Sequence, residues 1–302
     1  MPLVVSMRSV LLGQACTGNI EDIAVATNRT GNYAMADLAS LMPVLFVAHG
    51  GGPLPLLNDP SHQQHRAFLT SIAAQLPQPT AILLITAHWE ANEVALTSSQ
   101  APGMLYDYSG FPAESYQYRY PASGAPELAL QVQQLLQSQG VPCRLDSERG
   151  YDHGTFVPLM LMYPKANIPV LQMSLLRNLD AAAHINIGKA LADLRSQGVL
   201  IVGSGMSFHN LRALMSGDPR TSSLSSQFDE WLTAAITAEP SQMLTKLEQW
   251  QQAPAALFAH PRAEHLLPLH VCAGAAFAAG RAGECNYQDW LFNGKVSGYI
   301  WR

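Results

Sequence analysis

The chain has 302 residues, of which 48% are hydrophobic and only 13% are charged. This composition is typical of a folded globular protein and excludes the highly charged, weakly hydrophobic class that stays disordered. The 17 basic and 22 acidic residues give a formal net charge of -5 at pH 7, without a cluster of Lys or Arg. Nucleic-acid binding needs a concentrated positive surface, and a membrane span needs an apolar run of about 18 residues. We therefore expect neither a nucleic-acid nor a membrane partner.

The four cysteines are scattered and show no C-x-x-C spacing. This pattern favours a reducing compartment over a disulfide framework. The apolar stretch at residues 10–16 is too short for a signal sequence, and Glu21 and Asp22 soon follow it. We predict a cytoplasmic protein.

The first 41 residues keep no hydrophobic period of either 2 or 3.6, whereas a strong strand pattern begins just after Met42. We predict a loosely ordered N-terminal extension over residues 1–41. A single folded domain is predicted over residues 42–302.

From Met42 onward, short apolar runs alternate with amphipathic segments. The runs predict buried strands at residues 43–48, 80–87, 94–98, 141–145, 168–174, 199–204 and 299–301. Helices are predicted at residues 63–76, 127–139, 156–163, 181–196, 222–237, 241–251 and 265–279.

Strands that are apolar on both faces and separated by helices indicate a sheet that is covered on both sides. We therefore predict the α/β class: a single domain with a central, mostly parallel sheet and helices on both faces. Residues 101–124 are rich in Gly, Pro and Tyr and form a long aromatic loop. A loop of this length in a compact domain is usually functional.

Three of the ten histidines come at the ends of predicted strands: His49, His88 and His209. In open α/β sheets, ligands bind outside the carboxyl ends of the strands, so these imidazoles are expected to converge. Imidazole ligands suit zinc and iron, and no thiolate lies at these positions. One such histidine is more often a structural residue, but three in equivalent places favour a metal site.

Two further histidines have informative neighbours. His153 follows Asp152, which either orients the imidazole for proton transfer or, together with Thr155, simply caps a helix. His265 follows Glu264 at the start of a predicted helix, where it either completes a metal site or is a polar first-turn residue. The other histidines are interpreted as structural: His62, His65, His184, His260 and His270.

Motifs of other enzyme classes are missing from the sequence. Residues 203–207 read GSGMS rather than G-x-S-x-G, and there is no H-E-x-x-H. The glycines after His49 lack the Gly-Lys-Ser/Thr ending of a nucleotide-binding loop. H-G-G-G occurs in some esterases as an oxyanion-hole loop, but no nucleophile elbow follows it here.

Six segments carry a further pattern: VLFVAHGGGPLPLL (44–57), PTAILLITAHWE (79–90), YDYSGFPAESYQYRYPASGAPELA (106–129), YDHGTFVPLMLMYPKANIPVLQMSL (151–175), GSGMSFHNLR (203–212) and EHLLPLHVCAGAA (264–276). Taken in this order, they resemble the class III, LigB-type extradiol ring-cleavage dioxygenases, and more closely their DOPA 4,5-dioxygenase-like branch. The resemblance covers about residues 43 to 300, and five histidine-bearing blocks in the same order make it specific.

The resemblance implies a mononuclear, non-haem metal site. His49 and His88 match the first two ligands, and His265 matches the third. His209 matches a residue beside the metal that acts as a fourth ligand or a second proton shuttle, and His153 matches the acid/base. The catalytic metal is expected to be Fe2+, with Zn2+ possible as the bound ion, because imidazole ligation does not distinguish them.

The sequence departs from the pattern of that branch at three places. The first loop reads H-G-G-G-P rather than H-G-S-P, and Phe156 stands where Trp is usual. His265 takes a ligand position that is a carboxylate in the wider family, although Glu264 is adjacent. These differences bear on the substrate and the ligand set more than on the reaction class.

The function that we predict is a metal-dependent extradiol dioxygenase that inserts O2 into the ring of a catechol-type, DOPA-like diphenol next to its two hydroxyls. Its partners would be the catechol and O2, in a monomer or homodimer. Five aromatic residues of the loop either close over the substrate ring or pack against the sheet: Tyr106, Tyr108, Phe111, Tyr116 and Tyr120. The alternatives are a zinc-dependent hydrolase on the same scaffold and a metal-binding module without turnover.

Overall fold

The structure, a computed structural model, describes residues 41–302. The predicted extension over residues 1–41 lies outside the described residues except for Leu41, so that boundary stays a prediction. The described residues form one sheet of eight strands in the order β4-β3-β5-β2-β6-β1-β8-β7. The strands are β1 (Val44–Ala48), β2 (Ala81–Ala91), β3 (Val94–Thr97), β4 (Cys143–Asp146), β5 (Val170–Leu176), β6 (Val199–Gly205), β7 (Glu284–Leu291) and β8 (Gly294–Trp301).

The four central strands, β5, β2, β6 and β1, run parallel to one another. Antiparallel pairs flank them, because β3 pairs with β5, and the hairpin of β7 and β8 adds to β1. The helices are α2 (Gln63–Ile72), α3 (Pro126–Ser138), α4 (His153–Met162), α5 (Ala181–Leu191), α6 (Leu211–Ser216), α7 (Thr221–Ile236), α8 (Pro240–Glu248), α9 (Ala256–Ala259) and α10 (Leu267–Phe277).

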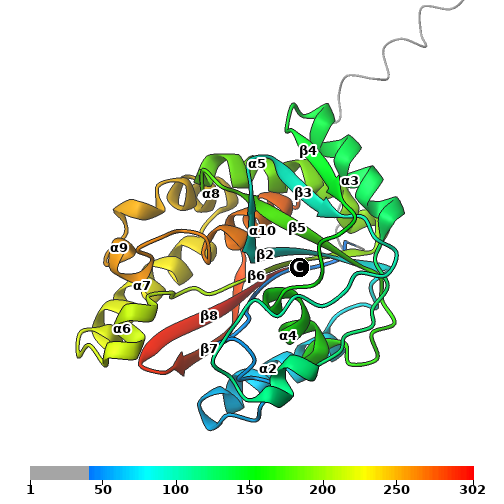
Figure 1. Cartoon of the computed structure of the whole chain (residues 1–302). Helices are drawn as coiled ribbons and strands as arrows, with labels where there is room; N and C mark the ends of the chain where they lie inside the picture. Colours follow the sequence, from blue (N-terminus) through cyan, green and yellow to red (C-terminus); the bar gives the residue numbers. More distant parts are fainter. Residues whose placement is uncertain (1–40) are drawn as a thin grey trace, which may run out of the picture. The chain divides into compact units, whose positions relative to one another are not determined.

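Alternate side chains of each central strand enter two separate cores. Val44 and Phe46 of β1 belong to the core that includes side chains of α5, α7, α8 and α10. Leu45 and Val47 point the other way, into the core beneath α2 and α4. Figure 1 shows α2 and α4 on one side of the sheet and α5, α8 and α10 on the other. The predicted α/β fold, with a mostly parallel sheet covered on both faces, is therefore confirmed.

Two predicted boundaries at the site differ from those in the structure. Strand β2 continues to Ala91 and so includes His88, whereas the prediction ended it at Ala87. Helix α10 begins at Leu267, so His265 lies in the segment before it. Both changes concern residues at the carboxyl edge of the sheet, where the site lies.

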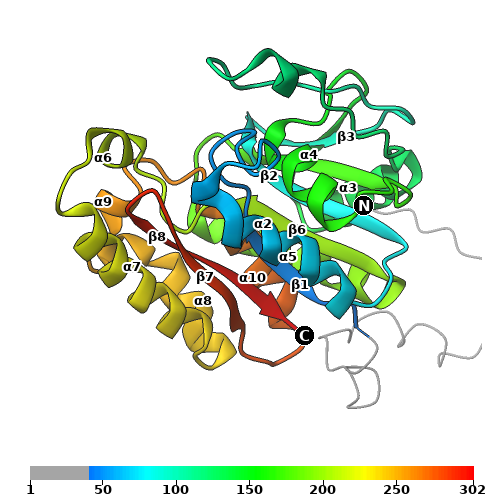
Figure 2. The same ribbon diagram turned by 90° about the horizontal axis from the view of Figure 1, so that it is seen from below.

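The hairpin of β7 and β8 is the main element that the prediction missed, since only residues 299–301 were expected to form a strand. Strand β7 is an edge strand whose residues are mostly exposed or half-buried, so it lacks a continuous apolar run. Figure 2 shows the hairpin reaching toward α6, a short helix that was also missed. Among the helices of residues 41–302, none has the length and apolar character needed to cross a lipid bilayer.

Candidate metal centre

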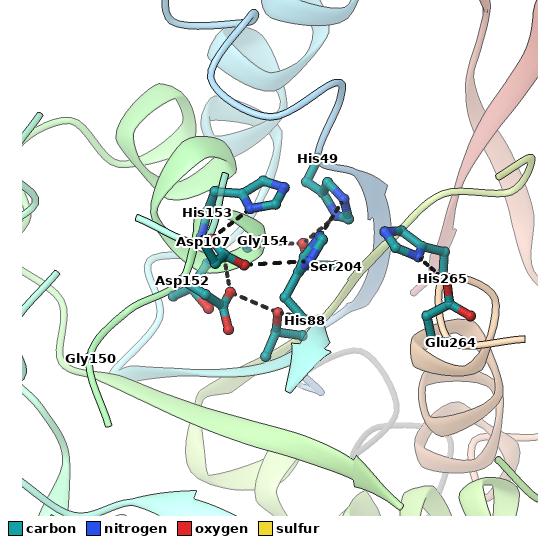
Figure 3. Close-up of polar contacts among 12 residues, drawn as sticks. His49, His88, Asp107, Gly150, Asp152, His153, Gly154, Ser204, Glu264 and His265 are labelled. Atoms are coloured by element: carbon teal, nitrogen blue, oxygen red, sulfur yellow. Dashed lines mark hydrogen bonds and ion pairs between the residues drawn. The ribbon is translucent and has the colours of Figure 1, made fainter. Parts of the chain in front are cut away.

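The structure brings together all five histidines that the sequence singled out. His49 follows β1, His88 lies near the end of β2, and His153 begins α4. The ring centroids of His49 and His88 are 4.8 Å apart, and those of His88 and His153 are 3.9 Å apart. His265 lies 4.9 Å from His88 and stacks on His209 at 3.3 Å, again between centroids. Figure 3 shows His49, His88, His153 and His265 gathered around one space.

The loop that carries His49 is held by helix α2. His65 Nε2 donates a hydrogen bond to the Ala48 carbonyl oxygen at 2.8 Å, and Gly51 N donates to His62 Nε2 at 3.0 Å. Gly50 has a φ of +86°, and a Cβ there would lie 2.6 Å from the Pro55 side chain. Only glycine fits this turn comfortably. His62 and His65 are thus structural, as predicted, and they fix the loop beside the site.

His88 is placed by an irregularity in β2. The register between β2 and β5 shifts between Ile85 and Glu90, and His88 lies within the shifted stretch. Such irregularities are common beside active sites, where they redirect a side chain. The Thr86 hydroxyl accepts a hydrogen bond from His88 N at 3.1 Å and fixes the backbone there.

His265 is placed by close contact with the end of β6. Met206 N donates a hydrogen bond to the His265 carbonyl oxygen at 2.9 Å. A Cβ on Gly205 would lie only 2.1 Å from that same oxygen, so this approach requires glycine. The neighbouring Glu264 forms an ion pair with Arg262, which also pairs with Glu90 of β2.

Asp152 does not orient the His153 ring; it caps α4. Asp152 Oδ1 accepts hydrogen bonds from Thr155 N at 3.1 Å and from the Thr86 hydroxyl at 2.8 Å. The partner of the ring is Asp107 of the aromatic loop, whose Oδ1 is 2.7 Å from His153 Nδ1. Asp107 was not among the site residues predicted from the sequence. The one signal for it was an acidic residue between two tyrosines in a loop that was expected to be functional.

Each of the five histidines has its Nδ1 atom within 3.5 Å of a side-chain oxygen. Asp107 lies beside His153 at 2.7 Å and beside His88 at 3.5 Å. Glu264 lies beside His265 at 3.1 Å and beside His209 at 3.5 Å. An ionised carboxylate only accepts hydrogen bonds, so Nδ1 carries the proton in His153 and His265, whose Nδ1 atoms are hydrogen-bonded to their carboxylates. Their Nε2 atoms therefore keep a free lone pair.

In His49, a hydroxyl group rather than a carboxylate keeps the proton on Nδ1. Ser204 Oγ donates its only proton to the Gly154 carbonyl oxygen in a short hydrogen bond. It can therefore only accept from His49 Nδ1, which lies 3.3 Å away. His49 Nε2 is left with a lone pair that points toward His88 (Figure 3).

The nearest pair of ring nitrogens fits a metal ion. His49 Nε2 and His88 Nε2 are 3.0 Å apart, close enough to share either a proton or one cation. Neutral imidazole nitrogens are common ligands of zinc and iron. The donor set therefore fits a divalent metal.

Burial keeps the rings of His49, His88 and His265 in the neutral form that binds metals. Burial and the neighbouring histidines lower the pKa of His49 and of His265 well below the usual value. Burial, with a smaller contribution from charge repulsion by His153, lowers the pKa of His88 to about 3. Burial tends to raise the pKa of Asp107, but its hydrogen bond and charge interaction with His153 outweigh this and bring it to about 2.

Within the described residues, two groups have ligand atoms close enough to share an ion. One is His49, His88 and His153, and the other is His209, Glu264 and His265. The ligand set implied by the resemblance takes members of both groups. The five histidines of the two groups line one cavity of about 470 Å³, so the arrangement can hold an ion with a further histidine at its side.

The aromatic loop contributes only part of what was expected. Tyr108 and Phe111 line the cavity, and the Tyr108 hydroxyl donates to the Ser115 carbonyl oxygen at 2.6 Å. Tyr106 and Tyr120 instead donate their hydroxyls to the backbone oxygens of residues 118 and 163. Tyr116 packs against Tyr106 and Tyr108. The loop therefore presents two rings to the cavity and uses the others for its own structure.

Comparison with known proteins identifies the family. Residues 38–295 match the family described as the catalytic LigB subunit of aromatic ring-opening dioxygenase. The chain is 39% identical over 257 residues to "Dioxygenase tasH" of Hapsidospora irregularis, covering 78% of each chain. It is 38% identical over 254 residues to "4,5-DOPA dioxygenase extradiol" of Beta vulgaris, covering 83% of this chain and 92% of the relative.

Two proteins from Escherichia coli agree with this assignment. The "4,5-DOPA dioxygenase extradiol" of strain K12 is 34% identical over 236 residues, covering 78% of this chain and 85% of that protein. The crystal structure of an uncharacterized protein from Escherichia coli K12 matches with a TM-score of 0.71 at 30% identity, covering 86% of this chain and 99% of that one. Because the family match spans most of the sequence and these relatives are more than 30% identical over most of their length, the chain belongs to the LigB family of extradiol ring-cleavage dioxygenases.

Proposed function

We propose that the protein is a metal-dependent dioxygenase that opens the ring of a catechol by inserting both atoms of O2 next to the two hydroxyls. The observation that carries the proposal is the orientation of the five histidines. Every Nδ1 lies within 3.5 Å of a side-chain oxygen, which leaves the Nε2 atoms of rings that all line one cavity to bind an ion or accept a proton. The family assignment supports the same chemistry.

His49, His88 and His265 are proposed to hold the ion. Their pKa values are lowered by burial, so they are neutral at physiological pH, as ligands must be. Three protein ligands leave room beside the ion for a substrate. A bound Fe2+ ion would supply the redox chemistry that joins O2 to the catechol ring.

His153 is proposed as the base that takes a phenolic proton. Its Nδ1 is held 2.7 Å from Asp107, so its Nε2 is the atom that receives the proton. Asp107 stays ionised, since its pKa is about 2, and it stabilises the imidazolium that forms. The same division of labour between carboxylate and imidazole is used in hydrolase triads. The proton can then be returned to the ring-opened product.

His209 has two proposed roles, fourth ligand and second proton shuttle. Its ring lies parallel to that of His265, and both Nδ1 atoms approach the same carboxylate oxygen of Glu264. The metal content of His209→Gln distinguishes the roles. Loss of the ion indicates a ligand, whereas retained metal with a lower rate indicates a shuttle.

The test is O2 uptake by anaerobically purified, Fe2+-loaded protein given a panel of catechols. We expect O2 consumption together with a yellow ring-opened product. His153→Gln should keep its iron and lose about 100-fold or more in rate, the usual contribution of a general base. His184→Gln is the matched control, because His184 bonds only to the backbone near α5. Absence of uptake across the panel, with iron confirmed bound, would overturn the proposal.

A further inference from the structure

We infer that the cavity selects catechols whose ring substituent is apolar and uncharged, in preference to substituents that carry a carboxylate or an amino-acid zwitterion. This inference rests on the proposed function, names the substrate class within it, and departs from the DOPA-like diphenol that the sequence led us to expect. It depends on the walls of the cavity rather than on the histidines.

The polar side chains that line the cavity already have partners. Asp107 is paired with His153 and His88, and the Tyr108 hydroxyl is bonded to Ser115. Gly51 N of the glycine loop is bonded to His62. These groups serve the histidine cluster and the loops around it. A charged substituent would find no free side-chain partner among them.

The apolar wall of the cavity comes largely from α6 and the β7–β8 hairpin, neither of which was predicted from the sequence. Leu214 of α6 and Leu291 and Val296 of the β7–β8 hairpin line it, together with Phe208. A Cβ on Gly294 would contact both Phe208 and Leu214, so the hairpin turn packs directly against α6. No lysine or arginine is present among the described residues that line the cavity.

The mouth of the cavity also exposes apolar side chains. Leu211 is 55% exposed, Met215 is 86% exposed and Phe292 is 46% exposed, and all three line the cavity. They are half of the six large hydrophobic side chains that are exposed within residues 41–302. Exposed apolar groups gathered at one opening are typical of a ligand-binding site. A hydrophobic substituent would cover them and gain the free energy of that burial.

A charge placed against this wall would lose hydration without gaining a partner. Moving a charged group into apolar surroundings is unfavourable unless it is paired. The carboxylate of an amino-acid substituent therefore weakens productive binding, whereas a propyl chain of similar length strengthens it. We expect a difference of about tenfold or more in kcat/KM.

The experiment compares three probes of similar length on the Fe2+-loaded protein: 4-propylcatechol, 3-(3,4-dihydroxyphenyl)propionate and DOPA. We expect 4-propylcatechol to exceed both charged probes by about tenfold or more in kcat/KM. Equal values, or a preference for the propionate or DOPA, would overturn the inference. A preference for the propionate would instead indicate a carboxylate site on the amides of the glycine loop.

A charge reversal on the wall gives an independent test. Met215→Arg places a cation at the mouth, on a side chain exposed enough to tolerate the change. The ratio of propionate to 4-propylcatechol activity should rise about twofold to fivefold, as expected for a partly exposed ion pair. Leu130→Arg on α3 is the control, since Leu130 is also exposed but does not line the cavity. An unchanged ratio in Met215→Arg would contradict the inference.

Failure of the inference can be separated from failure of the proposed function. If no catechol is cleaved with iron bound, the function is wrong. Anaerobic calorimetry with the same three probes then still ranks their affinities. It tests the preference of the apolar wall for an uncharged substituent without depending on catalysis. If all three are cleaved at similar rates and bind equally, the function stands and the selectivity is wrong.

Discussion

Replacing Asp107 by Asn tests whether one carboxylate supports both the proposed base and a proposed ligand. Asp107 Oδ1 accepts hydrogen bonds from His153 Nδ1 at 2.7 Å and from His153 N at 3.0 Å. Oδ2 lies 3.5 Å from His88 Nδ1. The amide of Asn would keep its oxygen toward the two His153 donors and turn its NH2 group toward His88.

The expected magnitude follows from these contacts. At His153, a charge-assisted hydrogen bond of about 1.5–3 kcal/mol is exchanged for a neutral one of about 0.5–1.5 kcal/mol. The protonated ring then loses about 1–2 kcal/mol of stabilisation, which corresponds to about fivefold to 30-fold in rate. At His88, the NH2 group of the new Asn would face Nδ1. This favours the tautomer that carries its proton on Nε2, the atom needed for the metal. Loss of such a partner typically weakens metal binding by about 10-fold to 100-fold.

The assay measures both effects on the same protein. Iron affinity is determined by competition with a chelator, and kcat is determined by O2 uptake at saturating iron, so that the two losses are separated. Glu114→Gln is the matched control, because Glu114 is an exposed acid in the same loop. A kcat and an iron affinity both equal to those of the unmodified protein would refute the role assigned to Asp107.

Three further predictions concern the ligands and the stability of the fold. Ser204→Ala removes the acceptor that fixes His49 Nδ1, so metal affinity should fall about tenfold in a chelator competition. Gly205→Ala places a methyl group against the His265 carbonyl oxygen and should lower the free energy of unfolding, measured in urea, by more than about 1 kcal/mol. Burial lowers the pKa of His270 to about 4, so its neutral form stabilises the fold above pH 6.5 and that contribution is lost as the pH falls toward 4. The loss is about 2 kcal/mol at pH 5, and His270→Gln should flatten the dependence of unfolding free energy on pH between 7 and 5.

The fold and the histidine cluster could be predicted because both follow from local patterns. The central strands are continuous apolar runs, since each is buried on both faces. The carboxyl ends of parallel strands meet at one edge of a sheet, so histidines at those ends converge even though His49 and His209 are 160 residues apart. Neither step needs any knowledge of side-chain packing.

The partners of the histidines could not be predicted because they come from loops without a period. Asp107 is 46 residues from His153 and approaches it only because the aromatic loop folds back over α4. Asp152, adjacent in sequence, was a plausible partner, but its carboxylate is used by the end of the helix. The β7–β8 hairpin was missed for a related reason, because an edge strand has no apolar run on either face.

The central parallel strands and the peripheral elements have different roles in the proposed site. The strands position the groups that react, whereas α6 and the hairpin determine which substrates bind. The parallel strands β1 and β2 bring His49 and His88 to the cavity, and the end of β6 contacts the segment that carries His265, so any change in strand register would move a proposed ligand. The apolar wall comes from α6 and the antiparallel hairpin, which carry no proposed ligand. Substitutions in that wall can therefore alter which ring substituent is accepted while the donor set stays intact. If Met215→Arg lowered iron affinity as strongly as it changed substrate preference, the two halves of the site would be coupled and this division would be wrong.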